Sequence, residues 1–102
     1  MIRELTDKTF EQDVKQASGT VLVEFFATWC PHCQHMQPLV EELAKTETHN
    51  TPIYQVDIDK CPDLAKVYAP DGFPTFVLFV DGKEAKHLVG EQTLEALREL
   101  IA

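Results

Sequence analysis

The segment Val21–Cys33 reads VLVEFFATWCPHC, and it says more about structure and chemistry than any other part of this 102-residue chain. Residues Val21–Ala27 are nearly all apolar and favour β-structure, which is typical of a strand buried on both faces. A helical pattern follows from about Pro31 to Lys45. The sequence therefore predicts a buried strand that leads into a helix, with two cysteines at the start of that helix.

Cys30 and Cys33 are separated by two residues. A disulfide needs Cα atoms about 4.4–6.8 Å apart, and one helical turn brings positions i and i+3 within that range. The unpaired N–H groups and the positive dipole end of a helix stabilise a thiolate, which is the form of cysteine that attacks. The pair is therefore a candidate redox dithiol.

A structural metal site and a pair of inert buried thiols are the alternatives for this motif. Zinc usually takes four ligands, and the remaining candidates are Cys61 and four histidines that are scattered without any paired spacing. His35 follows Cys33 by two residues, so we expect it to point away from the helix face that carries the cysteines. The context favours redox chemistry, and we expect no metal site.

Length and composition predict a single domain over residues 1–102 with an ordinary globular core, since 44% of the residues are hydrophobic. The net charge of −8 argues against nucleic acid as a partner. No apolar run approaches the roughly 18 residues that cross a membrane, and Ile2–Leu5 does not begin a signal peptide. We therefore expect a cytoplasmic protein without a membrane partner.

The rest of the chain alternates strand and helix patterns. Asp81-Gly82 is a strong hairpin signal, and Thr9–Gln12 has the form of a capping box within a helix that ends near Ala17. The remaining signals predict strands over 2–5, 53–57, 75–80 and 83–89, and helices over 62–68 and from about 94 to 101. This order predicts an α/β fold, a central mixed sheet of about five strands flanked by about four helices.

These residues resemble the thioredoxin family. Val21–Cys30 matches the family's strand and its tryptophan–cysteine entry to the active site, and Pro38 matches a proline that kinks the following helix. Asp57–Asp59, Gly72–Thr75 and Gly90 fall at similar spacings. The resemblance covers nearly the whole chain, so it implies a thioredoxin fold and thiol–disulfide exchange.

The resemblance implies a role for each residue near the dithiol. Cys30 is then the nucleophile and the more exposed thiol, and Cys33 resolves the mixed disulfide. Glu24 falls where the family has a buried carboxylate, usually aspartate, that accepts the proton of the resolving cysteine. A glutamate in an apolar strand is expected to have a raised pKa. The alternative for Glu24 is a strand-edge carboxylate paired with a lysine.

Phe73-Pro74 resembles the loop in which the family has a cis-proline facing the dithiol. The resemblance implies a shallow apolar surface that binds an extended segment of the substrate. Ordinary core packing is the alternative for Trp29 and Phe73, although Trp29 is expected to be exposed beside the thiol. The candidate substrate-binding residues are Trp29, Pro31, Phe73, Pro74, Val89 and Gly90.

Pro31-His32 departs from the Gly-Pro pair that is typical of thioredoxins and resembles the pair in the periplasmic oxidase DsbA. His32 is a candidate catalytic residue because it can donate to, or pair with, the Cys30 thiolate, which would make the disulfide a stronger oxidant. The alternative is a neutral His32 that points to solvent. Gln55 stands where many thioredoxins have a lysine near the buried carboxylate, so Glu24 is expected to hold its proton more readily.

The leading functional hypothesis is a general protein-disulfide reductant with no bound cofactor. It is expected to act on disulfide-containing proteins as a monomer and to receive electrons from a reductase of the thioredoxin-reductase type. The runner-up is a more oxidising disulfide oxidase or isomerase tuned by Pro31-His32. A non-catalytic docking or chaperone module, and a protein that binds a metal or cluster, are the remaining alternatives.

Overall fold

A computed structural model describes residues 2–47 and 50–102 of the chain. Its centre is a five-stranded sheet with the strand order β1-β3-β2-β4-β5. The strands β1, β3 and β2 run parallel, whereas β4 runs antiparallel to both β2 and β5. The sheet is therefore mixed, as predicted, and β2 lies at its centre. The strands are β1 (Arg3–Glu4), β2 (Thr20–Phe26), β3 (Ile53–Asp57), β4 (Thr75–Val80) and β5 (Lys83–Val89).

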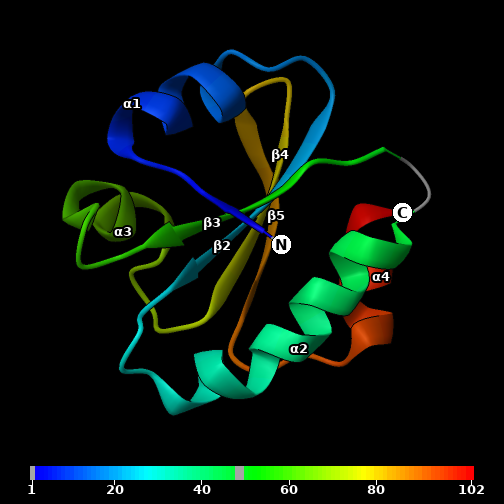
Figure 1. Cartoon of the computed structure of the whole chain (residues 1–102). Helices are drawn as coiled ribbons and strands as arrows, with labels where there is room; N and C mark the ends of the chain where they lie inside the picture. The colour runs from blue at the N-terminus through cyan, green and yellow to red at the C-terminus, as the bar shows by residue number, and fades with distance from the viewer. Residues whose placement is uncertain (1, 48–49) are drawn as a thin grey trace.

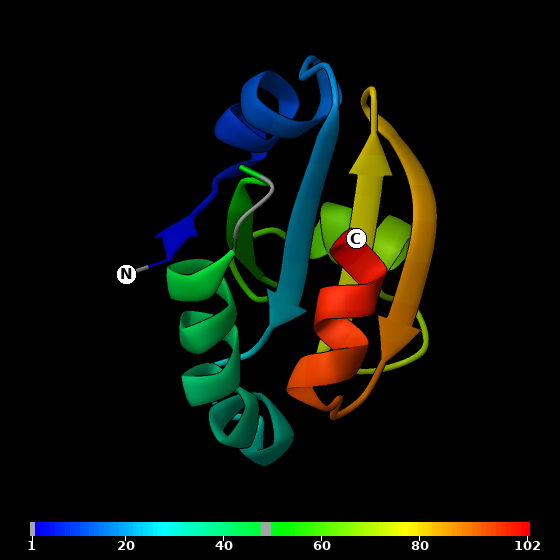
Figure 2. The same ribbon diagram turned by 90° about the vertical axis from the view of Figure 1, so that its right-hand side faces the viewer.

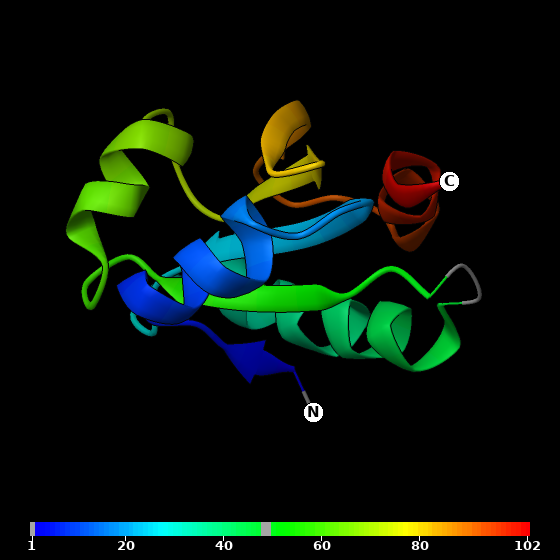
Figure 3. The ribbon, with the colours of Figure 1, turned by 90° about the horizontal axis from the view of Figure 1, so that it is seen from above.

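Helices cover both faces of the sheet. Figure 1 shows α1 and α3 on one side of the strands and α2 and α4 on the other, and Figure 3 shows the same layers from above. In Figure 2 the helices α2 and α4 lie side by side in front of the sheet. The helical segments are α1 (Asp7–Phe10), its π-helical continuation η1 (Glu11–Lys15), α2 (Pro31–Thr46), α3 (Pro62–Tyr68) and α4 (Leu94–Ile101).

The alternation of side chains along β2 divides the core into two layers. Val21, Val23 and Phe25 pack on the face that α1, η1 and α3 cover, because successive residues of a strand point to opposite faces. Leu22 packs among the residues of α2 and α4. Glu24 lies on the same face as Leu22 by this alternation, so a carboxyl group enters the layer beneath α2.

The first helix begins earlier than predicted. Thr6 is its N-cap: the Thr6 side chain accepts from the Thr9 N–H, and the Thr9 side chain accepts from the Thr6 N–H. The predicted capping box at Thr9 was therefore wrong, because Thr9 occupies the third helical position and Thr6 the cap. The expected strand over residues 2–5 is also shorter, since only Arg3 and Glu4 pair with β3.

Four segments meet at one end of the strands, the lower end in Figure 1, which is called the dithiol end below. They are the end of β2, the start of α2, the loop before β4 and the end of β5. Pro38 lies inside α2, which runs without interruption over 16 residues. Within the described ranges, none of the helices has the length and apolar character needed to cross a membrane.

Candidate active site

Cys30 is the N-cap residue of α2. The N–H of Cys33 donates to Cys30 Sγ at 3.2 Å, and the Cys30 thiol lies 3.8 Å from the carbonyl oxygen of Phe73. Both cysteines are free thiols and both are nearly covered, with exposed fractions of 5% for Cys30 and 4% for Cys33. The expected difference in exposure is thus almost absent. The two sulfurs differ in their place on the helix, since Cys30 caps the N-terminus of α2 and Cys33 lies one turn inside it.

Cys33 lies one turn inside the helix and is held in its protonated form. Burial is the main cause that raises the pKa of its thiol to about 12, and the neighbouring Cys30 and Glu24 raise the pKa further. A thiol with such a pKa is a poor nucleophile near neutral pH because little of it is ionised. Cys33 therefore needs a proton acceptor before it can attack.

The loop before β4 faces the dithiol. The peptide bond between Phe73 and Pro74 is cis, as the resemblance implied. The N–H of Gly90 donates to the carbonyl oxygen of Pro74 at 2.7 Å, which joins this loop to the end of β5. Thr75 Oγ1 donates to the carbonyl oxygen of Gly72 at 2.6 Å within the same loop. These bonds fix the backbone that lies opposite Cys30.

Exposed apolar side chains, here called the apolar rim, lie in the segments that meet at the dithiol. Trp29 is 60% exposed and Val89 is 40% exposed. The ring of Trp29 contacts the half-buried Phe73 edge to face, with centroids 6.3 Å apart. Trp29 Nε1 donates to Asp59 Oδ2 at 2.7 Å, an anchor that was not predicted from the sequence. The expected exposure of Trp29 is confirmed, and the hydrogen bond to Asp59 holds its indole at the rim.

Glu24 is almost completely buried in the central strand, with 1% of its surface exposed. Burial raises the pKa of its carboxyl group to about 7, although a hydrogen bond from Gln55 opposes this shift. Gln55 Nε2 donates to Glu24 Oε1 at 2.7 Å. Glu24 Oε2 has no hydrogen-bond partner among the residues that the structure describes. The alternative of a strand-edge glutamate paired with a lysine is therefore wrong.

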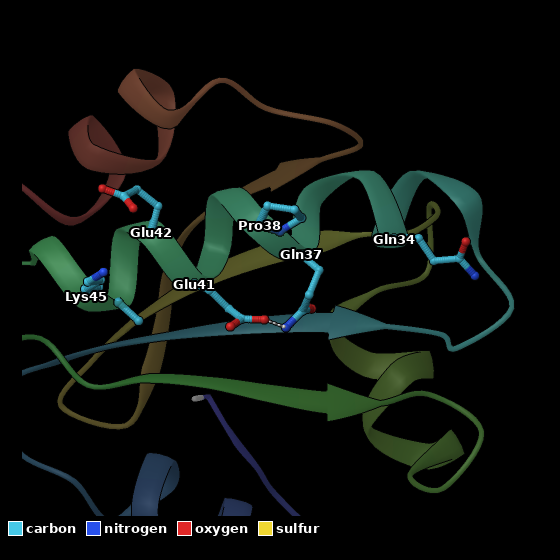
Figure 4. Close-up of a pocket in the computed structure, with 7 residues that line it drawn as sticks. Gln34, Gln37, Pro38, Glu41, Glu42 and Lys45 are labelled. Atoms are coloured by element: carbon cyan, nitrogen blue, oxygen red, sulfur yellow. Dashed lines mark hydrogen bonds between the residues drawn. The ribbon is translucent and has the colours of Figure 1, made fainter.

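A chain of hydrogen bonds connects Glu24 to the surface of α2. The amide of Gln55 also donates to Gln37 Oε1 at 2.8 Å, and Gln37 Nε2 donates to Glu41 Oε2 at 3.0 Å. Figure 4 shows Gln37 and Glu41 side by side and joined by this hydrogen bond. Both residues line an open hollow along α2 with a volume of about 750 Å³. The acceptor Glu41 fixes the orientation of both amides, so that an N–H of Gln55 points at the buried carboxyl group.

His32 lies in the first turn of α2 and contacts a residue far away in the sequence. Its Nδ1 lies 2.5 Å from Glu91 Oε2, and Nδ1 of His35 lies 3.4 Å from the same oxygen. These hydrogen bonds lower the pKa of the Glu91 carboxyl group. This cluster was not predicted from the sequence. The expectation that the histidines lack a paired spacing was wrong, because His32 and His35 are three residues apart on a helix, a spacing that brings side chains together.

Cys61 is buried beside the N-terminal segment of the chain. Its thiol lies 3.9 Å from the carbonyl oxygen of Leu5, and burial is the main cause that raises the pKa of this thiol. Cys61 is also the residue that precedes α3. It is a packed thiol that is not part of the rim around Cys30.

The chain resembles known proteins over its whole length. The family profile described as Thioredoxin matches residues 1–102. A thioredoxin of Chlamydia trachomatis is 39% identical over 100% of this chain and 97% of its own length. A thioredoxin of Mycobacterium tuberculosis is 37% identical over 94% of this chain and 84% of its own.

A solved structure supports the same conclusion. A mutant thioredoxin from Halobacterium salinarum superimposes with a TM-score of 0.85 and 36% identity, covering 97% of this chain and 86% of that one. The mixed sheet, the dithiol at the start of α2 and the cis peptide bond before Pro74 agree with these similarities. This chain belongs to the thioredoxin family and is a thiol–disulfide oxidoreductase of the thioredoxin type.

Proposed function

We propose that this protein reduces disulfides in other proteins, with Cys30 as the attacking thiolate and Cys33 as the resolving thiol. The observation that carries the proposal is the unequal environment of the two sulfurs. Cys30 Sγ accepts the N–H of Cys33 at the helix N-terminus, which stabilises a thiolate. Burial keeps Cys33 protonated by raising its pKa to about 12.

The reaction has two exchange steps. The Cys30 thiolate attacks one sulfur of the substrate disulfide, which forms a mixed disulfide and releases the other substrate sulfur as a thiolate. Cys33 then loses its proton and attacks Cys30 Sγ, which forms the Cys30–Cys33 disulfide and releases the second substrate thiolate. Two electrons pass from the dithiol to the substrate, and the two released thiolates take up protons.

Glu24 is the proton acceptor for Cys33 in this scheme. The charge of Glu24 acts on the thiol of Cys33, and a carboxyl group with a pKa of about 7 can take up and release a proton near neutral pH. Glu24 Oε2 has no hydrogen-bond partner among the described residues, so this oxygen is free to take up the proton. Ionisation of Glu24 therefore prepares the site for the second step.

The apolar rim is the surface that binds the substrate. The side chains of Trp29 and Val89 are exposed, and the loop that carries Phe73 and Pro74 is joined to Gly90 by a backbone hydrogen bond. An extended segment that enters here meets apolar side chains and a fixed loop. Such a surface suits many sequences because it makes few side-chain-specific polar contacts.

Electrons are proposed to come from a reductase of the thioredoxin-reductase type. A Bifunctional thioredoxin reductase/thioredoxin of Mycobacterium leprae is 35% identical to this chain over 92% of the chain and 20% of its own length. The two activities are named together in that protein, which supports a reductase as the donor here. Monomeric state and cytoplasmic location stay predictions from the sequence.

His32 is proposed to leave the dithiol reducing rather than to make it a DsbA-like oxidant. The His32 side chain is 66% exposed and its Nδ1 is engaged by the carboxylate of Glu91. The carboxylate offsets the positive charge of a protonated imidazole, so less of that charge stabilises the Cys30 thiolate. We expect a reduction potential near the thioredoxin value of about −270 mV.

Equilibration with glutathione buffers tests this direction of electron flow. Glu91→Gln should make the pair more oxidising than the parent protein, because it removes a negative charge that lies beside His32 at the start of α2. His32→Pro should leave the potential close to that of the parent protein. A parent potential above about −200 mV that falls in His32→Pro would instead show an oxidase or isomerase tuned by His32.

Trapping of the mixed disulfide tests the roles of the cysteines. Cys33→Ser should accumulate a covalent complex with a disulfide-containing protein such as insulin, whereas Cys30→Ser should not. Cys61→Ser is the matched control and should react like the parent protein. Equal trapping by the Cys30 and Cys33 variants would refute the assignment. A double Cys30→Ser, Cys33→Ser variant that retains full biological activity would indicate a docking module instead.

A further inference from the structure

His32, His35 and Glu91 form a compact cluster beside the dithiol. Two imidazoles come from successive turns of α2, and the carboxylate comes from the segment that follows β5. One ligand atom from each residue lies within 4.8 Å of the others. All three side chains are exposed, so a solute can reach the cluster directly from solvent.

The spacing of these atoms is close to that of a metal centre. Zn²⁺ binds imidazole nitrogen and carboxylate oxygen at about 2.0–2.2 Å, which places tetrahedral ligand atoms about 3.3 Å apart. Nδ1 of His35 is 3.4 Å from Glu91 Oε2, and Nδ1 of His32 is 2.5 Å from it. The first separation already fits, and rotation of exposed side chains opens the second by about 1 Å.

We propose that His32, His35 and Glu91 form a binding site for one divalent cation of the Zn²⁺ type. Two imidazole nitrogens and one carboxylate oxygen suit Zn²⁺, Cu²⁺ or Ni²⁺, whereas Ca²⁺ and Mg²⁺ prefer oxygen ligands. Three protein ligands leave a fourth position for water or another small ligand. The site lies outside the Cys-x-x-Cys motif and uses neither thiol as a ligand.

The second histidine distinguishes this cluster from an ordinary surface ion pair. His87 and Glu84 form such a pair on β5, with Nδ1 3.0 Å from Oε2. That pair supplies one imidazole and one carboxylate, so it lacks the third ligand within the described residues. His87 therefore provides a control of the same residue type, with a similar exposed carboxylate partner.

The cation would join two segments that border Cys30. His32 stands between the two cysteines of the dithiol, and Glu91 directly follows Gly90, whose N–H is bonded to Pro74. A bound cation would hold the first turns of α2 to the end of β5. This site does not depend on the proposed direction of electron transfer, because the three ligands are present in either redox state of the dithiol.

Calorimetric titration of the oxidised protein with Zn²⁺ tests the proposal. The Cys30–Cys33 disulfide removes both thiols as ligands, so binding of one Zn²⁺ per chain must use other groups. We expect His35→Asn and Glu91→Gln each to weaken binding by at least about tenfold, because each removes a direct ligand. His87→Asn should bind like the parent protein. Thermal unfolding of each variant should match the parent, since these side chains are exposed.

A second readout identifies the ligands. Binding of Co²⁺ to the oxidised protein should broaden the imidazole NMR signals of His32 and His35 and leave those of His87 sharp. The proposal is overturned if oxidised protein binds no Zn²⁺, if only the reduced dithiol binds it, or if His87→Asn weakens binding as much as His35→Asn. Equal affinity of Glu91→Gln and the parent protein would also overturn it.

Discussion

The two ends of the central sheet are built from different kinds of contact. At the end that carries the β4–β5 hairpin, the N–H of Asp81 donates to the carbonyl oxygen of Gly19 at 2.9 Å. The side chain of Asp81 accepts the N–H of Gly19 at 2.7 Å. At the dithiol end, Trp29 and Val89 are exposed and the thiol of Cys30 faces a backbone carbonyl group.

The hairpin end is also the more tightly closed of the two. Gly82 has a φ of +82°, and a Cβ atom added there would lie 2.1 Å from the carbonyl oxygen of Lys15. A Cβ atom added at Gly90, at the dithiol end, would meet no atom of the described residues beyond its chain neighbours within 4 Å. The two ends therefore have different roles. Backbone contacts at the hairpin end hold the sheet together, and the open surface at the dithiol end leaves room for a substrate.

Cys30→Ser at the dithiol end should have the largest effect on function. We expect disulfide reduction to fall to the uncatalysed rate, because the attacking sulfur is lost. The free energy of unfolding should change little, since serine can still cap α2. Insulin reduction and urea unfolding measure the two quantities. Substantial residual reduction would contradict the assigned nucleophile.

Glu24→Gln tests the link between the dithiol end and the middle of the sheet. The folded protein holds the Glu24 proton up to a pKa of about 7, whereas the reference value is 4.5. Folding therefore binds a proton between these pH values, and stability falls as the pH rises from about 4.5 to 7. The titration of Glu24 lowers the free energy of unfolding by about 3 kcal/mol across that pH range.

Urea unfolding at pH 4.5 and pH 8 measures this effect as a difference between the parent and Glu24→Gln. The variant should lose less stability on going to the higher pH, by about 3 kcal/mol. It should also resolve the mixed disulfide more slowly near neutral pH, because Cys33 has lost its proton acceptor. An unchanged single-turnover rate of resolution would exclude that role for Glu24.

Gly82→Ala should break the hairpin end without changing the chemistry. The positive φ and the close approach to Lys15 predict a destabilisation of about 2–3 kcal/mol, measured by urea unfolding. The reduction potential of the folded protein should stay the same. Gly90→Ala is the matched control for the contact with Lys15. Its φ of +90° imposes a similar backbone strain, but the added Cβ atom has no close neighbour among the described residues. Similar destabilisation by both variants would show that the contact with Lys15 contributes nothing.

Gln55→Leu should give the smallest effect and refine the role of Glu24. Loss of the N–H donor raises the pKa of Glu24 further, because that hydrogen bond opposes the shift caused by burial. If the hydrogen bond contributes about 1 kcal/mol net, its loss moves the midpoint of the pH dependence of mixed-disulfide resolution upward by somewhat less than one pH unit. The pH profile of mixed-disulfide resolution measures the midpoint. Gln34→Leu, on the outer surface of α2, should leave it unchanged.

Much of the fold could be predicted because its signals are local. The strands Ile53–Asp57, Thr75–Val80 and Lys83–Val89 have the predicted bounds, since each is a short β-prone run bordered by proline, glycine or aspartate. The first helix was placed too late because Thr6 and Thr9 can both cap a helix, and only the contacts between them show which one does.

The site was predictable in its motif and less so in its contacts. Cys30 and Cys33 follow from sequence spacing, and the cis peptide bond before Pro74 was implied only by family resemblance. The contact between His32 and Glu91 joins residues 59 positions apart, and no local pattern predicts it. The near-equal burial of the two thiols likewise depends on the loop before β4 covering Cys30, which is a tertiary contact.

The position of Trp29 gives the protein a built-in optical probe. It is the only tryptophan in the chain, it directly precedes Cys30, and its indole is held by Asp59 at the rim of the site. Emission from the unlabelled protein therefore originates almost entirely beside the dithiol. Closure of the disulfide, arrival of a substrate segment and release of the product can each be followed as a change in fluorescence during a single turnover.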